Sequence, residues 1–505
     1  MPLPNSGAEW PPPHLEKVRA EIIENDTWYA GDPEALGSLY AGTSSTGGRP
    51  SQYKGGVVGK VARWWWGTPP AKGEQSTKLH VPLASDLCAT SSDLLFSEPP
   101  KLTATDTESP EADAFLDDLL EDGLVSVLQE GAELGAAHGG VYLRNVWNKD
   151  VRERPWTSVV HADMAVPTFR WGRLHEVTFW QILPGTDNSQ VVWRLLEHHA
   201  VGSIEHALFK GTPDNLGQLV PLEDHPDSAY LADLVDANSQ QRTGLTRLTA
   251  QYVPNMLPNR LHRGSNQGRS DLQGLLPLLD SLDEAFTSWR RDIRHGKSRI
   301  HMPAQYLESN GPGDGAVADL DREVYVPIEG VLASGDSGLL IDAQQFKIRV
   351  QEHMDTVNDW VKRIIESAGY STQSLTSGTG GAVTAAEVHS HERRSYMTRG
   401  KKIRRWTTAI VEHVETQIEI ANKNLGLGLG EFGVKVEFED GVQDAALNIA
   451  QTAQTLFNAQ AASHETLVKM VNPDWDQKQV DAEVAKIMEQ YGSGAPLPDP
   501  EDAGF

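Results

Sequence analysis

One predicted helix constrains this chain more than any other feature. Thr384 and Glu387 form a capping box, a pair of side chains that satisfies free backbone N–H groups at a helix N-terminus and contributes on the order of 1 kcal/mol. The helix that begins there can continue to about Asn424. Such a length is unusual within one compact domain. The chain has 505 residues, roughly three domains' worth of sequence, so we expect more than one structural region.

Apolar residues recur at helical spacing in several other segments. The predicted helices cover 14–30, 83–96, 110–138, 270–296, 346–368, 444–470 and 476–491. Two prolines that follow Phe96 end the second of these helices, because proline cannot continue a helix. In the fourth, Ser270 and Gln273 are candidates for a capping box, and Pro277 indicates either a kink or a later start.

Two sections have the composition of β-strands. Residues 141–222 hold three runs rich in β-branched and aromatic residues, "VYLRNVW", "VTFWQIL" and "VVWRLLEHH", which are separated by turn-forming residues. Residues 298–345 contain two shorter runs, and one further strand is predicted at 434–440. The stretch 223–268 is polar and irregular. The sequence therefore predicts an α+β fold that is mainly helical.

Composition narrows the class of protein. With 39% hydrophobic and 23% charged residues, the chain can bury sizeable cores and is not a disordered chain. Its single cysteine, Cys88, excludes an internal disulfide framework, and we expect it to be a small buried residue of a helix. The N-terminus lacks a signal-peptide pattern, and no apolar run approaches the ~20 residues of a membrane-spanning helix. We expect a soluble protein, made in a cytoplasm and without a membrane partner.

Charge is unevenly distributed along the chain. The formal net charge of −26 would on average repel a nucleic-acid backbone. Ten acidic residues and no lysine or arginine lie between Leu102 and Tyr142. A later run has seven basic and no acidic residues: Arg393, Arg394, Arg399, Lys401, Lys402, Arg404 and Arg405. Each segment could be a solvated helix face. Alternatively, the acidic and basic faces meet between copies of the chain.

Three motifs suggest nucleotide or metal sites, but each lacks an essential feature. The glycine-rich loop Thr376–Gly381 has no lysine and follows a helix instead of a strand, so it fails as a phosphate-binding loop. The Gly-Lys-Ser sequence at 296–298 ends like such a loop, yet Arg291 stands where its first glycine belongs. His389 and His391 are two residues apart and point to nearly opposite sides of a helix. We expect no cofactor, no metal ion and no catalytic residue.

Two alternative functions are each suggested by one feature of the sequence. A carbohydrate-active enzyme could stack sugars on the tryptophans of the β-rich section, although a sheet core is the simpler explanation for them. These residues are Trp147, Trp156, Trp171, Trp180 and Trp193. A nucleic-acid-binding protein could use the basic run 393–405, but only Tyr396 and Trp406 lie near it for base stacking. The triplet 64–66, three tryptophans, could be an exposed patch or part of a buried strand.

The stretches "LHVPLASDLCATSSDLLFSEPPKLT", from Leu79, and "LLDSLDEAFTSWRRDIRHGKSRIHMP", from Leu278, resemble the portal proteins of tailed double-stranded DNA phages. The likeness is to the branch common in siphophages of Gram-positive hosts, and it covers most of residues 55–490. It implies a virion protein, assembled in the host cytoplasm, that forms a twelve-fold ring at one capsid vertex. The implied partners are further copies of the chain, the terminase large subunit, the head-tail connector or adaptor, the major capsid and scaffolding proteins, and double-stranded DNA passing without sequence specificity.

The resemblance also divides the chain into the regions of a portal fold. These are an N-terminal arm (1–60), a wing of helices and the β-rich section (61–269), a stem helix (270–297), a clip (298–345), a second stem helix (346–370), a tunnel loop (371–383), a long wing helix and strand (384–443), a helical crown (444–491) and a disordered tail (492–505). The tunnel loop would line the constriction of the channel with Ser374, Thr376, Ser377, Gly378, Thr379, Gly380 and Gly381.

The charge pattern agrees with a conduit that does not hold its DNA. Lysine or arginine contacts with phosphates would bind the duplex and slow it. The segment from Ser371 to Thr384 carries no formal charge, which suits low-friction passage. The basic run 393–405 then needs another partner. We expect the acidic wing of a neighbouring subunit, because a heterologous ring repeats one contact at every interface.

Overall fold

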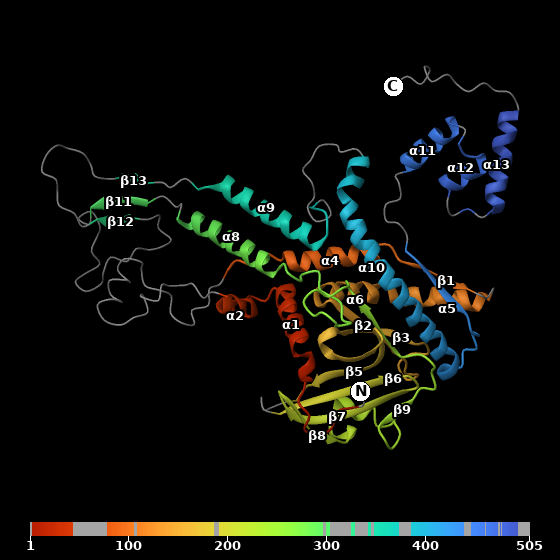
Figure 1. The fold of residues 1–505 in the computed structure, drawn as a ribbon, viewed down its shortest axis with the longest axis horizontal. Helices are drawn as coiled ribbons and strands as arrows, with labels where there is room; N and C mark the ends of the chain where they lie inside the picture. Colours follow the sequence, from red (N-terminus) through yellow and green to blue (C-terminus); the bar gives the residue numbers. More distant parts are fainter. Residues whose placement is uncertain are drawn as a thin grey trace. The chain divides into compact units, whose positions relative to one another are not determined.

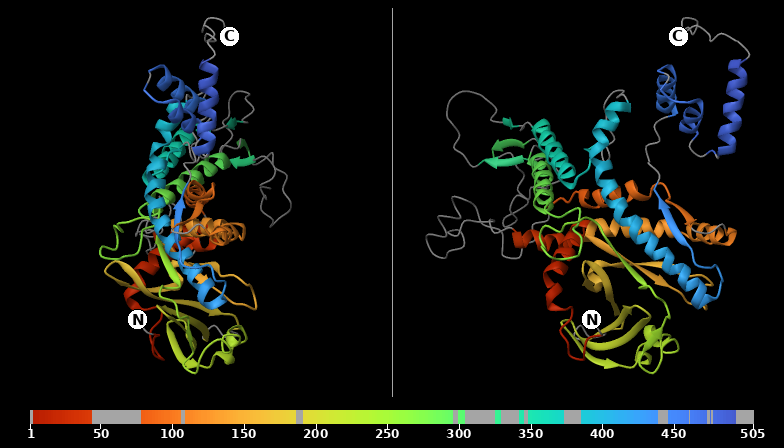
Figure 2. Two further views of the ribbon diagram at one scale, coloured as in Figure 1. Left: turned by 90° about the vertical axis from the view of Figure 1, so that its right-hand side faces the viewer. Right: turned by 45° about the vertical axis from the view of Figure 1, so that its right-hand side comes forward.

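The computed structural model of this chain contains two compact units, Met1–Phe438 and Glu439–Phe505. The residues that it describes are 3–43, 78–105, 109–185, 191–295, 299–303, 325–328, 342–344, 348–372, 385–438, 446–459, 461–472, 475 and 477–492. The described part of the first unit combines helices and sheets, whereas that of the second is helical (Figure 1 and Figure 2). A mixed α+β fold is therefore confirmed.

The N-terminal part of the first unit is mainly helical. Its helices are η1 (Pro13–Leu15), α1 (Glu16–Ala30), α2 (Pro33–Thr43), α4 (Leu83–Phe96), α5 (Pro110–Glu121) and α6 (Leu124–His138). The predicted end of α4 at Phe96 is confirmed. The prediction of one helix over 110–138 is wrong, because the chain breaks at Gly123 between α5 and α6. Gly123 has a φ of +90°, a left-handed conformation that glycine adopts without a Cβ clash.

Residues 140–254 form two antiparallel sheets. Their strands are β2 (Gly140–Val146), β3 (Trp156–His161), β4 (Ala165–Arg170), β5 (Arg173–Leu183), β6 (Val192–Ala200), β7 (Ser203–Thr212), β8 (Asn215–Val220), β9 (Gln240–Arg242) and β10 (Ala250–Pro254). One sheet has the order β10-β2-β3; the other is the meander β4-β5-β6-β7-β8, with β9 paired to β7. Three short helices, η3 (Ala162–Met164), η4 (Leu222–Asp224) and α7 (Pro226–Ala229), connect strands. The predicted β-rich section is confirmed, but β10 lies where we expected irregular chain.

Two helices, α8 (Leu276–His295) and α9 (Val350–Ala368), lie side by side (Figure 1). The residues between them include three short strands that form one sheet: β11 (Arg299–Pro303), β12 (Tyr325–Ile328) and β13 (Asp342–Gln344). The two strands predicted in this stretch are confirmed, and β13 was missed.

The start of α8 resolves the ambiguity that Pro277 created. The helix begins at Leu276, so proline occupies its first turn, where the missing N–H has no helical partner to lose. The expected capping box at Ser270 is wrong. The Ser270 hydroxyl instead donates to the backbone carbonyl of Ala136 (3.0 Å).

The longest of the described elements is α10 (Ala385–Ile420), which continues into a π-helical turn, η7 (Ala421–Leu425). The predicted length is confirmed, while its expected cap, Thr384, lies outside the described residues. Beside α10, β1 (Lys101–Thr105) pairs antiparallel with β14 (Gly433–Glu437). The main hydrophobic core gathers around one side of α10, which contributes Trp406, Ala409, Ile410, Val414 and Ile418.

The second unit contains α11 (Ala446–Asn458), α12 (His464–Val471) and α13 (Gln477–Gly492). The prediction of one helix over 444–470 is wrong, because a new helix begins after Ser463. The Ser463 hydroxyl accepts a hydrogen bond from the backbone N–H of Thr466 (3.2 Å) and so caps α12. Among the described helices of either unit, none is long and apolar enough to cross a bilayer.

Candidate functional site

The inner face of α10 carries a buried ion pair. The Nζ of Lys402 lies 2.5 Å from Oδ2 of Asp271, and each side chain is 2% exposed. Lys402 also donates to the hydroxyl of Ser91 on α4 (2.6 Å). Asp271 accepts hydrogen bonds from the Tyr370 hydroxyl (2.7 Å) and the Asn255 amide (2.8 Å). One carboxylate therefore joins α10 to the residues that precede α8, follow α9 and follow β10.

Burial and the charge of Asp271 fix the protonation of the groups around this junction. Burial, and then the negative charge of Asp271, raise the pKa of the Tyr370 hydroxyl well above its usual value. The same two causes raise the pKa of the Cys88 thiol, which is buried in α4 as predicted. Both groups therefore stay protonated at neutral pH. An ion pair inside a protein costs desolvation energy on both sides, and the surrounding hydrogen bonds offset part of that cost.

Backbone contacts hold together the two segments that flank the glycine-rich loop. The N–H of Ser371 donates to the Ser395 hydroxyl (2.8 Å), and the Thr398 hydroxyl donates to the carbonyl of Gly369 (2.7 Å). The Nε of Arg399 donates to the Leu94 carbonyl on α4 (2.6 Å). The chain is thus fixed to α10 where it leaves α9. The predicted tunnel-loop residues themselves, Ser374, Thr376, Ser377, Gly378, Thr379, Gly380 and Gly381, lie outside the described residues.

The basic run on α10 is divided between two faces of the helix. Arg399 and Lys402 are buried and bonded inside the chain, so the expectation that all seven bases meet a neighbouring subunit needs correction for these two. The remaining five are exposed, and no ion pair within the described chain engages them: Arg393, Arg394, Lys401, Arg404 and Arg405. Met397 lies among them and is also exposed. Helical periodicity could have indicated that Lys402 is buried, because it lies four residues before the buried Trp406 and therefore on the same face of α10.

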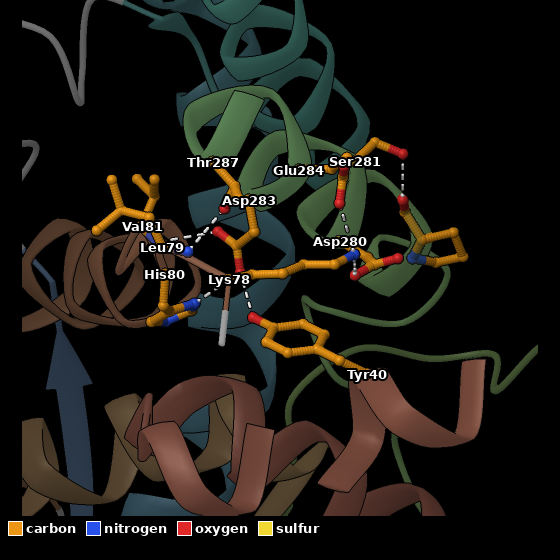
Figure 3. A network of polar contacts seen from close by, with 11 residues as sticks. Tyr40, Lys78, Leu79, His80, Val81, Asp280, Ser281, Asp283, Glu284 and Thr287 are labelled. Atoms are coloured by element: carbon orange, nitrogen blue, oxygen red, sulfur yellow. Dashed lines mark hydrogen bonds and ion pairs between the residues drawn. The ribbon is translucent and has the colours of Figure 1, made fainter. Parts of the chain in front are cut away.

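A second buried carboxylate, Asp283, fixes α8 (Figure 3). Its Oδ2 accepts a hydrogen bond from the Tyr40 hydroxyl (2.5 Å) and lies 2.9 Å from the Nδ1 of His80. Its Oδ1 accepts from the backbone N–H of Val81 (2.9 Å). Burial, and then the hydrogen bond to Asp283, raise the pKa of Tyr40. This site was not predicted from the sequence, although Asp283 falls on the apolar stripe of the helix between Leu279 and Phe286.

Residues 78–81, which we call the strap, run along α8 beside Asp283 (Figure 3). The Nζ of Lys78 lies 2.7 Å from Asp280 and 3.4 Å from Glu284. It also lies 4.9 Å from the ring centroid of Tyr40. The backbone N–H of Leu79 donates to the Thr287 hydroxyl (2.8 Å). The strap thereby binds two turns of α8 through side chains that point toward it from the helix.

The α8–α9 pair is tied together near its other end. Asp292 on α8 lies 2.8 Å from Arg349 and 2.9 Å from the Nε2 of His353. Hydrogen bonds from His353 and Arg349 lower the pKa of this carboxyl. The rings of Trp289 and His353 stack, with an interplanar angle of 7° and centroids 5.9 Å apart. These contacts join the C-terminal end of α8 to the N-terminal end of α9, so the two helices run antiparallel, while Asp283 and Asp271 hold the opposite end of the pair to the rest of the unit.

The sequence profile of one family, described as "Phage portal protein, SPP1 Gp6-like", matches residues 12–493. This chain belongs to that family. Among solved structures, one titled "Neck of native GTA particle computed with C12 symmetry" is similar at 13% identity and a TM-score of 0.36, covering 86% of this chain and 98% of its own. No match is found among the curated proteins.

Membership of a portal family places this chain among structural proteins of the phage virion, so it is not an enzyme. The carbohydrate-active alternative is thereby excluded. Of its tryptophans, Trp180 is buried in the sheet region and Trp171 is fully exposed. His389 and His391 lie on α10, and no cluster of three or more possible metal ligands occurs among the described residues. The segments 64–66 and 296–298 lie outside those residues.

The acidic segment of the portal chain is partly paired internally. Asp118 lies 2.8 Å from Arg154, and Asp122 lies 2.5 Å from Arg152. Glu133 accepts a hydrogen bond from the Tyr29 hydroxyl (2.7 Å). The other acids whose side chains the structure describes are exposed: Glu111, Asp113, Asp117, Glu121 and Glu130. Two faces of opposite charge, one on α10 and one on α5 and α6, are therefore accessible within the first unit.

Proposed function

We propose that copies of this chain assemble into a ring at one vertex of a phage capsid and form the conduit for DNA packaging and ejection. The family match over residues 12–493 is the observation that carries this proposal. The resemblance implies twelve subunits. It also implies docking of the terminase large subunit and the head-tail connector or adaptor, and contacts with the major capsid and scaffolding proteins.

We assign the regions of the portal fold to the observed elements. In this assignment α8 and α9 are the stem (270–297 and 346–370), and β11–β13 belong to the clip (298–345). The helix α10 and strand β14 form the inner wing (384–443), and α11–α13 form the crown (444–491). The assignment of the stem is supported by the pairing of α8 with α9. The assignment of 371–383 to the tunnel loop is supported by the fixed positions of Ser371 and Ser395, which would anchor both ends of a loop beside moving DNA.

The exposed bases of α10 are the proposed contact with a neighbouring subunit. Five positive side chains without an internal partner among the described residues face the same side as Met397, and five exposed acids on α5 and α6 offer the complementary charge. A ring with heterologous contacts would bring one such pair of faces together at every interface.

Assembly tests the ring directly. Size-exclusion chromatography with light scattering should give a mass many times 55.4 kDa for the full chain. Reversing Arg404 and Arg405 to glutamate should reduce assembly, because like charges would then face each other, while subunit helicity is retained. Reversing Lys149 and Arg242, which are exposed elsewhere, should leave assembly intact. A monomer across a broad range of salt and concentration would contradict the ring.

A nucleic-acid role for the same bases gives a different result. If the R404E/R405E variant forms normal rings but loses affinity for duplex DNA, the basic face contacts DNA and the interface proposal is wrong. Introducing lysines at Asp113 and Asp117 into the reversed variant should restore assembly if the two faces meet. That rescue would not occur if α10 contacted phosphate.

The tunnel loop is tested by stiffening it. Replacing Gly380 and Gly381 with proline should leave ring formation nearly unchanged while DNA packaging falls, since proline fixes φ in a loop that must yield to the duplex. Limited proteolysis with and without ATP examines the nucleotide-site alternative. Protection of the loop by ATP, or unimpaired packaging by the double-proline ring, would overturn the tunnel-loop assignment.

A further inference from the structure

The turn between β4 and β5 presents an exposed tryptophan in an unfavourable backbone conformation. Arg170 and Arg173 are paired, and the two residues between them, Trp171 and Gly172, have φ values of 51° and 81°. Positive φ at both central positions is typical of type I′ hairpin turns, in which asparagine and glycine are favoured. An L-residue with a large side chain is disfavoured there. The Trp171 side chain is fully exposed, so burial within the unit does not compensate for this conformation.

Two arginines flank this tryptophan. Arg170 is exposed, and the side chain of Arg173 is 89% exposed, with its guanidinium only within 4.0 Å of Glu412 on α10. We call the four residues from Arg170 to Arg173 the RWGR tip. Tryptophan and arginine are the residue types that contribute most often to protein–protein binding energy. The RWGR tip therefore has the residue types of a binding surface, and its exposed side chains contribute little to the stability of the unit.

An open groove of about 660 Å³ lies next to the RWGR tip. Its apolar lining comes from Leu15, Val18, Pro167 and Phe169, and Leu261 adds a further exposed apolar side chain at its border. Its cationic lining comes from Lys17 and Arg263. His14 and His262 also line it, and His262 is paired with Glu21 (2.7 Å). None of the described residues that line it is acidic. A Cβ on Gly172 would lie 3.8 Å from Oδ1 of Asn266, so the tip adjoins the groove directly.

We propose that the RWGR tip and this groove bind an acidic segment of another protein that also carries apolar side chains. A local surface lined by bases and lacking acids is unusual on a chain of net charge −26, and it complements a negatively charged partner. The apolar lining of the groove and Trp171 would contact the apolar side chains that lie between the acidic residues of the partner. Duplex DNA keeps its bases stacked inside the helix and presents phosphates, so it would leave the apolar side chains of the groove uncovered. The inference does not depend on ring assembly, because every residue in it belongs to one subunit.

Binding of a defined acidic probe tests the proposal. A fluorescein-labelled random copolymer of glutamate and tyrosine should bind the full-length protein, with an affinity that falls as salt concentration rises. The W171A variant and the R170E/R173E variant should each bind at least about tenfold more weakly, as expected for hot-spot residues. The control is V201A, which alters an exposed residue at the corresponding two-residue turn between β6 and β7.

The W171N variant separates binding from folding. Asparagine favours the left-handed conformation, so the melting temperature should be unchanged or higher while affinity for the copolymer is lost. Unchanged affinity in W171A and R170E/R173E, or no binding by the wild type, would refute the proposal. Binding of duplex DNA with the same dependence on Trp171 would assign the surface to nucleic acid instead. Loss of self-association in W171A would assign it to contacts between copies of this chain.

Discussion

The two faces of α10 between Arg393 and Arg405 use the same residue types for opposite purposes. On the inner face, Lys402 is enclosed with Asp271, and Arg399 is bonded to the backbone of α4. On the outer face, five bases reach solvent without an ion pair in the described chain. The inner bases position α10 in its own subunit, and the outer bases are available for contacts with another molecule. A run of like charges in a sequence is therefore not one functional unit.

The helix α8 repeats this contrast with acidic residues. Asp283 has a side chain that is 1% exposed and accepts hydrogen bonds that fix the strap and α2. Asp280 and Glu284 lie on either side of it in sequence, are far more exposed and share Lys78. Partly exposed ion pairs of this kind contribute less to stability than the Asp283 carboxylate, whose loss leaves several buried donors unpaired. The difference between the buried Asp283 and its more exposed neighbours should therefore appear as a difference in the free energy of unfolding.

The largest effect is expected for Lys402→Met. The substitution leaves Asp271 buried without its counter-ion and should destabilise the subunit by about 3–5 kcal/mol. Urea denaturation followed by circular dichroism measures this change. Lys401→Met is the matched control, because Lys401 is the adjacent residue and its side chain is exposed. Adding Asp271→Asn to Lys402→Met should recover part of the loss, and equal midpoints for K402M and K401M would show that the ion pair does not stabilise the fold.

A smaller effect is expected for Asp283→Asn. The amide nitrogen of asparagine would face the donors of Tyr40 and His80 and leave at least one of them unpaired, at a cost of about 1–3 kcal/mol. Hydrogen exchange at the backbone N–H of Val81 should accelerate in the variant. Asp280→Asn, which alters a partly exposed pair with Lys78, should change both measurements little. Equal exchange rates in the two variants would count against Asp283 as the residue that fixes the strap.

The inner face of α10 should also respond to pH through His413. Burial lowers the pKa of His413 to about 3, and its Nε2 lies 2.9 Å from the Thr157 hydroxyl. The unfolded chain takes up the proton near pH 6.5 and the folded chain does not, so stability falls as pH decreases below about 6.5. One such group contributes a slope of up to about 1.4 kcal/mol per pH unit.

Replacing His413 with glutamine tests this slope. Glutamine retains a polar partner for Thr157 but does not titrate, so the stability of H413Q should decline less between pH 6 and pH 4 than that of the wild type. Thermal unfolding across this range measures the difference. His198, whose pKa burial lowers to about 4, adds a smaller contribution of the same sign. The exposed His14→Gln is the control, and parallel curves for H413Q and the wild type would contradict the prediction.

The smallest effect on the subunit is expected for the outer bases. Arg404→Ala with Arg405→Ala should change the unfolding free energy of the isolated subunit by no more than about 0.5 kcal/mol per site, as is usual at exposed positions. The same variant should assemble less well than the wild type. A large loss of subunit stability would mean that these side chains make contacts inside the chain, and the proposed division of α10 into two faces would be wrong.

Local patterns were sufficient for much of the fold. Helical periodicity located α1, α4, α8, α9 and α10, and β-branched runs located the sheets, because these signals depend on neighbouring residues. The breaks at Gly123 and before Ser463 were missed, since the apolar pattern continues across both. The strand β10 was missed because it is short and lies in polar chain; only its partner β2, more than a hundred residues away, completes its hydrogen bonds.

The sequence by itself determined the family, the long helix and the uneven charge. Only the tertiary structure decided what each charge does. Asp271 and Lys402 are 131 residues apart, and Tyr40 and Asp283 are 243 apart, so no local pattern links them. Whether a charged side chain is buried beside its partner or left in water depends on which helix face packs inward. That choice results from the burial of apolar residues along the whole unit, which the chain makes only when it folds.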